Sequence, residues 1–289
     1  MNDFIQTFSF VVMPFLVMLT FSVILPAAGS ALYIRNEMML AIALPPLSGA
    51  ALTLGVACGL PPGNHAVLFI FSFVVVYGIV TLLGGLRLSE IKRQILQASL
   101  FAAGTALTHL VMSVSPEAHA HLQFLLTGEL LSLGPAELSE SLVLCVTGSM
   151  LFLLYRNAVF SYCIDEETMR LRTVRFRTFT VIYRLMITLL ISAAVPFIGP
   201  LLTSALLIFP PLFSDNGRNS IGAFFITGMI IGISGAAAGF AIGVGRDIPP
   251  AYSGAIGILI PGIGYKLITV LISAGRKNIR KKQHGTGKC

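Results

Sequence analysis

The sequence predicts an all-α, polytopic membrane protein with about nine transmembrane helices, and its composition and charge spacing are the basis of that prediction. Of the 289 residues, 55% are hydrophobic and 11% are charged, whereas an average soluble domain is about 25% charged. The mean hydropathy is +0.88. The few charged residues cluster, so long apolar stretches remain between them. No stretch alternates in polarity over the ~10 residues of a membrane barrel strand, so the spans are helices.

Nine apolar segments approach the length of about 20 residues that crosses a hydrocarbon core. In chain order they lie at 8–33, 38–58, 66–86, 94–114, 137–155, 178–197, 200–214, 220–243 and 252–274. The first lacks the basic flank of a cleavable signal peptide, so we expect it to be retained. The seventh is short. The apolar stretch 120–133 is a candidate for a further half-span that enters the protein without crossing.

The distribution of basic residues predicts an outside N-terminus and a cytoplasmic C-terminus. With nine crossings, 16 of the 19 Lys and Arg fall in cytoplasmic connections or the tail, Arg184 and Lys266 fall within spans, and Arg246 falls outside. This asymmetry is the positive-inside bias of membrane proteins. The net charge of +7 therefore reports topology, not nucleic acid binding. We expect one transmembrane domain over 1–275 and a basic cytoplasmic tail over 276–289.

Proline and glycine are placed unusually in three spans. Pro45–Pro46 and Pro210–Pro211 lie inside the second and seventh spans, where they remove intrahelical hydrogen bonds and predict kinks or breaks. Glycines in the eighth span predict close helix packing. They are Gly228, Gly232, Gly235 and Gly239. Packing and bending is one interpretation, and broken helices that line a translocation path are the other.

The connection at 156–177 differs from the other predicted cytoplasmic loops. Its end, FSYCIDEETMRLRTVRFR at 160–177, places acids before arginines, which favours a helix because it matches the dipole at both ends. The segment is either a solvated turn that fixes topology or a docking helix for a soluble cytoplasmic partner. Its candidate residues are Asp165, Glu166, Glu167, Met169, Arg170, Leu171, Arg172 and Val174.

Ionisable side chains in or beside spans are candidate ligands for a transported ion, because such groups are costly in a membrane. His109 lies in the outer half of the fourth span, and His119 and His121 form an H-x-H pair in the outer loop that follows. Glu129 lies in the apolar stretch 120–133. The alternatives are an interhelical hydrogen bond for His109, ordinary loop polarity for the pair, and a structural role for Glu129.

Three further charged residues have expected structural roles. Asp247, before Pro249, is expected to cap or orient the start of the last span. Arg184 either snorkels toward the cytoplasm or pairs within the bundle, and Lys266 is expected to snorkel.

Five segments together resemble one family. IGPLLTSALLIFPP at 198–211 is the closest match, to a "GPLL-x-x-ALL-x-x-P" seventh span, and RDIPPAYSGAIGILI at 246–260 is similar to a "D-x-P-x-G" entry into the last span. The other matches are AAGSALYIRNEM at 27–38, TGELLSLGPAEL at 127–138 and DEETMRLRTV at 165–174. Over nearly its whole length the chain thus resembles the membrane-spanning permease subunit of the metal-ion ABC importers, which take up zinc, manganese or iron.

The resemblance implies a multi-pass permease in a bacterial inner membrane. Its implied partners are cytoplasmic ATPase subunits, an extracytoplasmic metal-binding protein and a second permease copy or paralogue. The chain has no Gly-x-x-x-x-Gly-Lys-Ser/Thr loop, so we expect no enzymatic activity and no bound cofactor, with ATP used by the partner. Candidate gating or packing positions are Pro45, Pro46, Gly199, Pro200, Pro210, Pro211, Asp247 and Pro249.

The second span departs from the pattern of that family. Members that carry transition metals usually have an Asp and, four residues later, a His, whereas the matching residues here are Leu40 and Leu44. Leucine cannot ligate a metal, so the resemblance implies the architecture but not this metal site.

Two other function classes fit the sequence less well than an ATPase-driven transport subunit. A self-sufficient secondary transporter or channel would need polar relays along its spans, which are nearly empty of them. An intramembrane enzyme would show a HExxH motif or paired membrane aspartates, and neither occurs. A subunit that moves a small cation with energy from partner ATPases is therefore the leading prediction.

Overall fold

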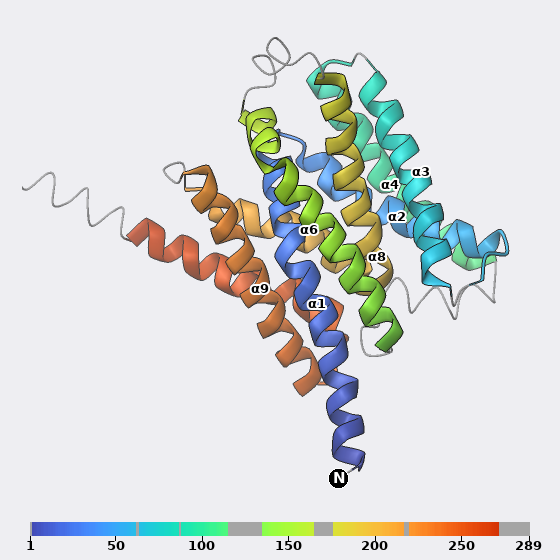
Figure 1. The fold of residues 1–289 in the computed structure, drawn as a ribbon, viewed down its shortest axis with the longest axis vertical. Coiled ribbons are helices and arrows are strands. Elements are labelled where there is room, and N and C mark those ends of the chain that lie inside the picture. Colours follow the sequence, from blue (N-terminus) through green and yellow to red (C-terminus); the bar gives the residue numbers. More distant parts are fainter. Residues whose placement is uncertain are drawn as a thin grey trace, which may run out of the picture.

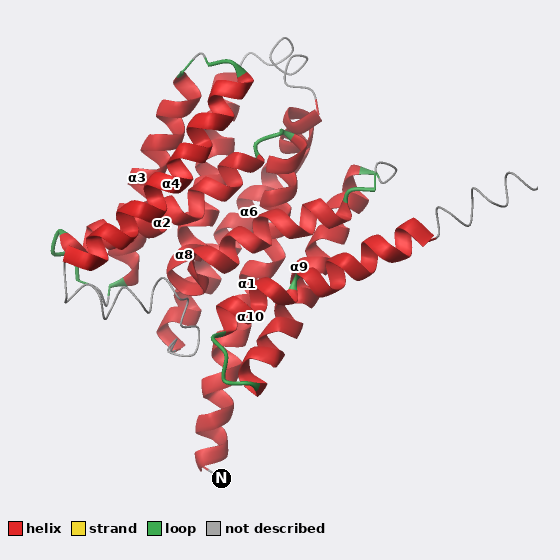
Figure 2. Ribbon diagram, turned by 180° about the vertical axis from the view of Figure 1, so that it is seen from behind, coloured by secondary structure: helices red, strands yellow, loops and turns green. Residues whose placement is uncertain are grey.

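The computed structural model describes residues 2–61, 64–86, 88–114, 135–164, 176–216 and 220–271, and the regular structure in these ranges is helical (Figures 1 and 2). The helices are α1 (Asn2–Ile34), α2 (Met38–Ala57), α3 (His65–Gly85), α4 (Glu90–Val114), α6 (Pro135–Ile164), α8 (Phe176–Ser214), α9 (Ile221–Gly245) and α10 (Pro250–Gly257). A turn at Ile258 separates α10 from a last helical run at 259–271. The prediction of an all-α protein is confirmed for these residues.

Helices α1 and α8 form the centre of the bundle. Helix α1 contacts α6, α8 and α9, while α8 also contacts α2, α3 and α10. In Figure 1, α2, α3 and α4 lie on one side of α8, and α9 lies on the other. The largest fully buried side chains come mostly from α1, α2 and α8: Phe21, Met18, Leu25, Leu32, Leu44, Leu52, Met186 and Leu190.

The outer helices keep apolar side chains on the surface. Exposed large hydrophobic residues occur on α3, α4, α6, α9 and the run at 259–271, for example Leu82, Ile91, Leu154, Ile230 and Leu271. A soluble protein of this size would cover such surface with charged groups, whereas lipid accepts it without cost.

Seven helices in the described residues are long and apolar enough to cross a membrane, and Ser139–Leu154 is a shorter apolar helix. The predicted spans each fall on one of these helices. The predicted sixth and seventh spans are both parts of α8, which has a non-helical residue, Gly199, between them.

The break in α8 follows from a glycine-proline pair. Gly199 has φ 76° and ψ 160°, a conformation that only glycine adopts without strain. Pro200 also disfavours helical angles in the residue before it. After the break, the Thr203 hydroxyl donates to the Gly199 carbonyl at 2.7 Å. The Ser204 hydroxyl donates to the Pro200 carbonyl at 2.8 Å. Both are local bonds from a side chain to the carbonyl four residues earlier, in the first turn after the break.

The proline pairs do not interrupt their helices, so of the expected kink or break at each pair the break is absent. Helix α2 runs through Pro45–Pro46, and α8 continues through Pro210–Pro211 to Ser214. A proline inside a helix removes a donor but keeps a helical φ, and packing in a membrane bundle tolerates it. At α2 the packing is close, because a Cβ on Gly104 of α4 would lie 3.0 Å from the backbone nitrogen of Leu47.

The glycines of α9 serve close packing on two sides, as the packing interpretation predicted. A Cβ on Gly232 would lie 2.5 Å from Cγ of Pro26 in α1. On the other side, Gly235 and Gly239 lie against the backbone of Ile258 and Gly254. Small residues therefore let α1, α9 and α10 approach closely.

Helix ends follow ordinary capping rules. Asn64 and Ser220 accept hydrogen bonds from backbone amides three residues on, at 3.3 Å, and so begin α3 and α9. Helices α1, α2 and α9 end on Asn36, Gly59 and Asp247, whose φ values are positive. In each case the next amide donates to the carbonyl five residues earlier, at 2.9 to 3.1 Å, which is the Schellman arrangement.

Candidate functional site

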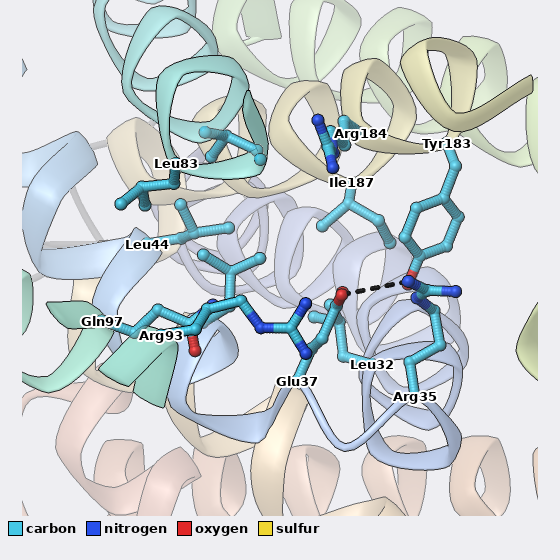
Figure 3. Close-up of a pocket in the computed structure, with 13 residues that line it drawn as sticks. Leu32, Arg35, Glu37, Leu44, Leu83, Arg93, Gln97, Tyr183, Arg184 and Ile187 are labelled. Atoms are coloured by element: carbon cyan, nitrogen blue, oxygen red, sulfur yellow. Dashed lines mark hydrogen bonds and ion pairs between the residues drawn. The ribbon is translucent and has the colours of Figure 1, made fainter. Parts of the chain in front are cut away.

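A cavity of about 40 Å³ lies where α1, α2, α3, α4 and α8 converge (Figure 3). Its wall combines leucines with polar and charged groups that come from separate parts of the sequence. The polar and charged groups in this wall are Arg35, Glu37, Arg93, Gln97, Tyr183 and Arg184.

Two of these charged residues, Arg35 and Glu37, lie directly after the end of α1. Asn36 adopts φ 56°, so the chain turns sharply and the Glu37 amide donates to the Leu32 carbonyl at 2.9 Å. This turn brings the Arg35 and Glu37 side chains together as an ion pair of 3.2 Å, both largely buried. The Arg35 guanidinium also lies over the Tyr183 ring, 5.4 Å from its centroid. A cation above an aromatic face is stabilised by the ring quadrupole.

The Arg184 guanidinium packs directly against Gly84 of α3. A Cβ on Gly84 of α3 would overlap the Arg184 guanidinium, so the absence of a side chain there makes room for the charge. The Arg184 carbonyl accepts a hydrogen bond of 2.7 Å from Thr188. The Arg184 side chain lines the cavity wall, and none of the carboxylates that the structure describes forms an ion pair with it, so the predicted pairing within the bundle is not seen there.

Helix α4 contributes Arg93 and Gln97, which lie one turn apart and therefore share a face. Gln97 is buried and Arg93 is half-buried. Leu40 and Leu44 of α2 line the same cavity. The two positions at which the family resemblance would expect metal ligands therefore face this cavity with apolar side chains. Three guanidinium groups and one carboxylate give the wall an excess of positive charge.

A second polar cluster joins three helix ends. The Tyr33 hydroxyl donates to Asp215 Oδ2 at 2.7 Å, and Lys266 Nζ donates to the Asp215 carbonyl oxygen. The Asn216 amide donates to the Tyr265 hydroxyl at 2.9 Å. Lys266 therefore bonds to a defined backbone group instead of only extending toward solvent.

The predicted ion ligands are not brought together in the described part of the chain. His109 lies on an exposed face of α4. His119, His121 and Glu129 lie outside the described residues, as does the predicted docking segment from Asp165 to Val174. Among residues that the structure describes, no group of three or more His, Cys, Asp and Glu could hold a metal ion.

Asp247 does not cap the last span, so of the two expected roles, capping or orienting, the cap is absent. The N-cap of α10 is Pro249, which makes no side-chain cap, and Pro250 fills the first helical turn. Asp247 instead has φ 54° and ends α9, where a short polar side chain tolerates the left-handed conformation.

The sequence did not single out Glu37, Arg93, Gln97 or Tyr183. Arg93 was counted only as evidence of topology, and Gln97 and Tyr183 carry no motif. Their convergence depends on the packing of α1, α2, α4 and α8, which single-segment patterns do not encode.

The long apolar helices and their apolar outer faces define a multi-pass α-helical membrane protein. Residues 7–269 match the ABC 3 transport family. No curated protein sequence matches the chain.

Two solved structures share the fold. PsaBC from Streptococcus pneumoniae, in complex with Fab, aligns with a TM-score of 0.77 and 17% identity, over 93% of each chain. A protein described as a metal-chelate type ABC transporter, in an inward-facing conformation, aligns with a TM-score of 0.67 and 18% identity over 92% of this chain and 88% of that one.

The chain belongs to the ABC 3 transport family and is a membrane-spanning permease. The predicted resemblance to ABC importer permeases is therefore confirmed at the level of family and fold.

Proposed function

We propose that the chain is the permease of an ABC importer for a divalent metal ion such as zinc, manganese or iron. The observation that supports it most is the family match over residues 7–269. The fold shared with PsaBC and with a metal-chelate type ABC transporter agrees with it. The ion would pass through the membrane when a separate ATPase changes conformation.

The proposed topology has nine crossings, an outside N-terminus and a cytoplasmic C-terminus in a bacterial inner membrane. The 16-to-1 bias of basic residues supports it. The nine crossings include both arms of α8, on either side of Gly199, and α6. Residues 1–275 form the transmembrane domain and 276–289 a cytoplasmic tail.

The proposed partners are two cytoplasmic ATPase subunits, an extracytoplasmic metal-binding protein and a second permease copy or paralogue. The lack of a phosphate-binding loop in the sequence supports a separate ATPase. The segment 160–177 would dock on the ATPase through Met169, Leu171 and Val174 and transmit its closure to the helices.

The proposed transient ligands for the ion are His109, His119, His121 and Glu129. Imidazole and carboxylate suit zinc and manganese, and all four lie at or beyond the outer half of the predicted spans. Gly199, with Pro200, is the proposed hinge, because α8 already departs from helical geometry there.

Uptake of labelled zinc or manganese into vesicles tests the function. The vesicles contain the chain, its cognate ATPase and its binding protein. We expect accumulation that requires ATP and falls at least severalfold when His109, His119 and His121 are changed to Ala. His284→Ala, in the predicted tail, is the control. Accumulation by the chain alone would favour the alternative, a secondary transporter or channel. Unchanged uptake in the triple variant would remove the histidines from the path.

Co-purification tests the docking segment. A variant with Met169, Leu171 and Val174 changed to Asp should release the ATPase subunit, because charge on an apolar docking face carries a desolvation cost. The control variant, with Thr168 and Thr173 changed to Asp, adds charge to the same loop without removing apolar groups. Equal retention of the ATPase by both variants would exclude docking through this face.

A further inference from the structure

The cavity between α1, α2, α3, α4 and α8 carries more positive charge than the described residues neutralise. Its charged wall consists of Arg35, Arg93, Arg184 and Glu37. Glu37 pairs with Arg35 at 3.2 Å, and this is the single ion pair found among the described residues. Arg93 and Arg184 thus face the cavity with no carboxylate within ion-pair distance in the part of the chain that the structure covers.

The guanidinium groups of Arg93 and Arg184, which have no ion-pair partner in the described ranges, are both partly withdrawn from water. Arg184 is half-buried and lies against Gly84, whose missing side chain leaves the space that its guanidinium fills. Arg93 is half-buried as well, with the buried amide of Gln97 one turn away. Withdrawing a charge from water without a counter-charge costs free energy, and a bound anion would offset that cost.

We propose that this cavity binds a small oxyanion of the phosphate or carboxylate class, held by Arg93 and Arg184. Guanidinium groups recognise such oxyanions through paired N–H donors, and Gln97 supplies further donors. In Figure 3, the Arg93 side chain, from α4, extends toward Glu37, while Arg184, from α8, lies apart from it beyond Ile187.

The size of the cavity fits this class of ligand. A single water needs about 10–15 Å³ of such space. The cavity of about 40 Å³ therefore holds a few waters or one oxyanion group. Its leucines, including Leu40 and Leu44, exclude larger polar groups on that side.

The excess positive charge of the cavity wall also disfavours the binding of a bare metal ion. A divalent cation would meet two guanidinium groups that no described carboxylate pairs, and the one carboxylate of the wall is already paired with Arg35. The cavity is therefore distinct in chemistry from the proposed ligands of the transported ion, and the proposal does not depend on that ion.

The oxyanion has two sources with the same chemistry. It is either a free anion or the phosphate of an anionic lipid, since basic pockets between transmembrane helices near the cytoplasmic side bind lipid head groups. The cavity lies at helix ends that the basic-residue bias assigns to that side.

Thermal unfolding of the full-length, delipidated chain in neutral detergent tests the proposal. Sodium phosphate is compared with sodium chloride at equal ionic strength. At about ten times Kd, phosphate should raise Tm by about 3 °C. Arg184→Gln and Arg93→Gln should each abolish the rise. Arg246→Gln, at an exposed position outside the cavity, should keep it.

Binding of labelled phosphate by dialysis provides a readout that does not depend on stability. Binding of one phosphate per wild-type chain, and loss of that binding in Arg93→Gln, would support the proposal. This result stands even if the Arg184→Gln variant fails to fold.

A second arm replaces phosphate with phosphatidylglycerol in mixed micelles, with lipid retention measured by native mass spectrometry. Retention by the wild type and its loss in Arg93→Gln, without an effect of free phosphate, assigns the lipid as the source and supports the proposal.

Two results would overturn the proposal. The first is that neither phosphate nor phosphatidylglycerol binds in a way that depends on Arg93 or Arg184. The second is that manganese or zinc chloride alone stabilises the wild type and that Glu37→Gln removes the effect, because the cavity would then be a cation site.

Discussion

The Tyr33 hydroxyl donates a 2.7 Å hydrogen bond to Asp215, and this contact joins the last turn of α1 to the residue that follows α8. Lys266, from the last helical run, donates to the carbonyl of the same Asp215. One aspartate therefore connects three helices that are far apart in the sequence. Such a junction fixes one end of the central helix pair.

Replacing Tyr33 with Phe should loosen this junction. The change removes only the hydroxyl and leaves an Asp215 carboxylate oxygen without this donor, so we expect the free energy of unfolding to fall by about 1–2 kcal/mol. Thermal unfolding of the purified chain in detergent measures it. Tyr252→Phe, on an exposed tyrosine of α10, is the matched control. Equal stability of the two variants would show that the junction is not a stabilising contact.

The positions of the helices were largely predictable, and the reason is the hydrophobic length that a bilayer demands. Each predicted span lies on a helix of the structure, although the sixth and seventh are two parts of the single helix α8, because apolar runs bounded by charges report length directly. The helical course through Pro45–Pro46 was not predictable from proline content. Packing against Gly104 of α4 is a tertiary property.

Gly84→Ala should displace the Arg184 guanidinium from its packing position against α3. A methyl group at Gly84 would overlap the guanidinium, which has to move from the space it fills. Overpacking of this kind costs about 1–3 kcal/mol. Gly78→Ala, on the same helix with open space around it, should be neutral or slightly stabilising.

Arg184→Ala in the Gly84→Ala background provides the decisive comparison, by thermal unfolding. If the guanidinium is the obstacle, Gly84→Ala should cost less in that background than in the wild type. An equal cost in both backgrounds would place the strain elsewhere.

The candidate site was much less predictable than the helices. Spans that are apolar on all sides have no polar face that reveals which side chains point inward. His109 illustrates this, since its place in a span does not say which way its side chain points, and in the structure it lies on an exposed face of α4. Arg93 and Arg184 belong to different segments, so their meeting at one cavity required the packed structure.

Gly235→Ala should weaken the packing of α9 against α10. The added Cβ would meet the backbone at Ile258, which cannot rotate away as a side chain does. We expect a loss of about 2 kcal/mol or more, at the upper end for overpacked sites. Gly222→Ala, on the same helix with no atom within 4 Å of the added carbon, is the control. Urea unfolding in detergent compares them, and a Gly235→Ala variant as stable as the control would contradict the packing of α9 on α10.

Gly199→Ala should strain the break in α8. At φ 76° and ψ 160° an alanine is held in a region that L residues rarely adopt, at a cost of about 1–3 kcal/mol. Gly245→Ala, near the end of α9 and with open space around it, should show little change. Thermal unfolding measures both. Because Pro200 keeps the preceding residue out of the helical region, Pro200→Ala combined with Gly199→Ala should recover part of the loss by allowing a straighter helix. No recovery, together with full destabilisation by Gly199→Ala alone, would mean that the kink is imposed by the surrounding helices and not by this local pair.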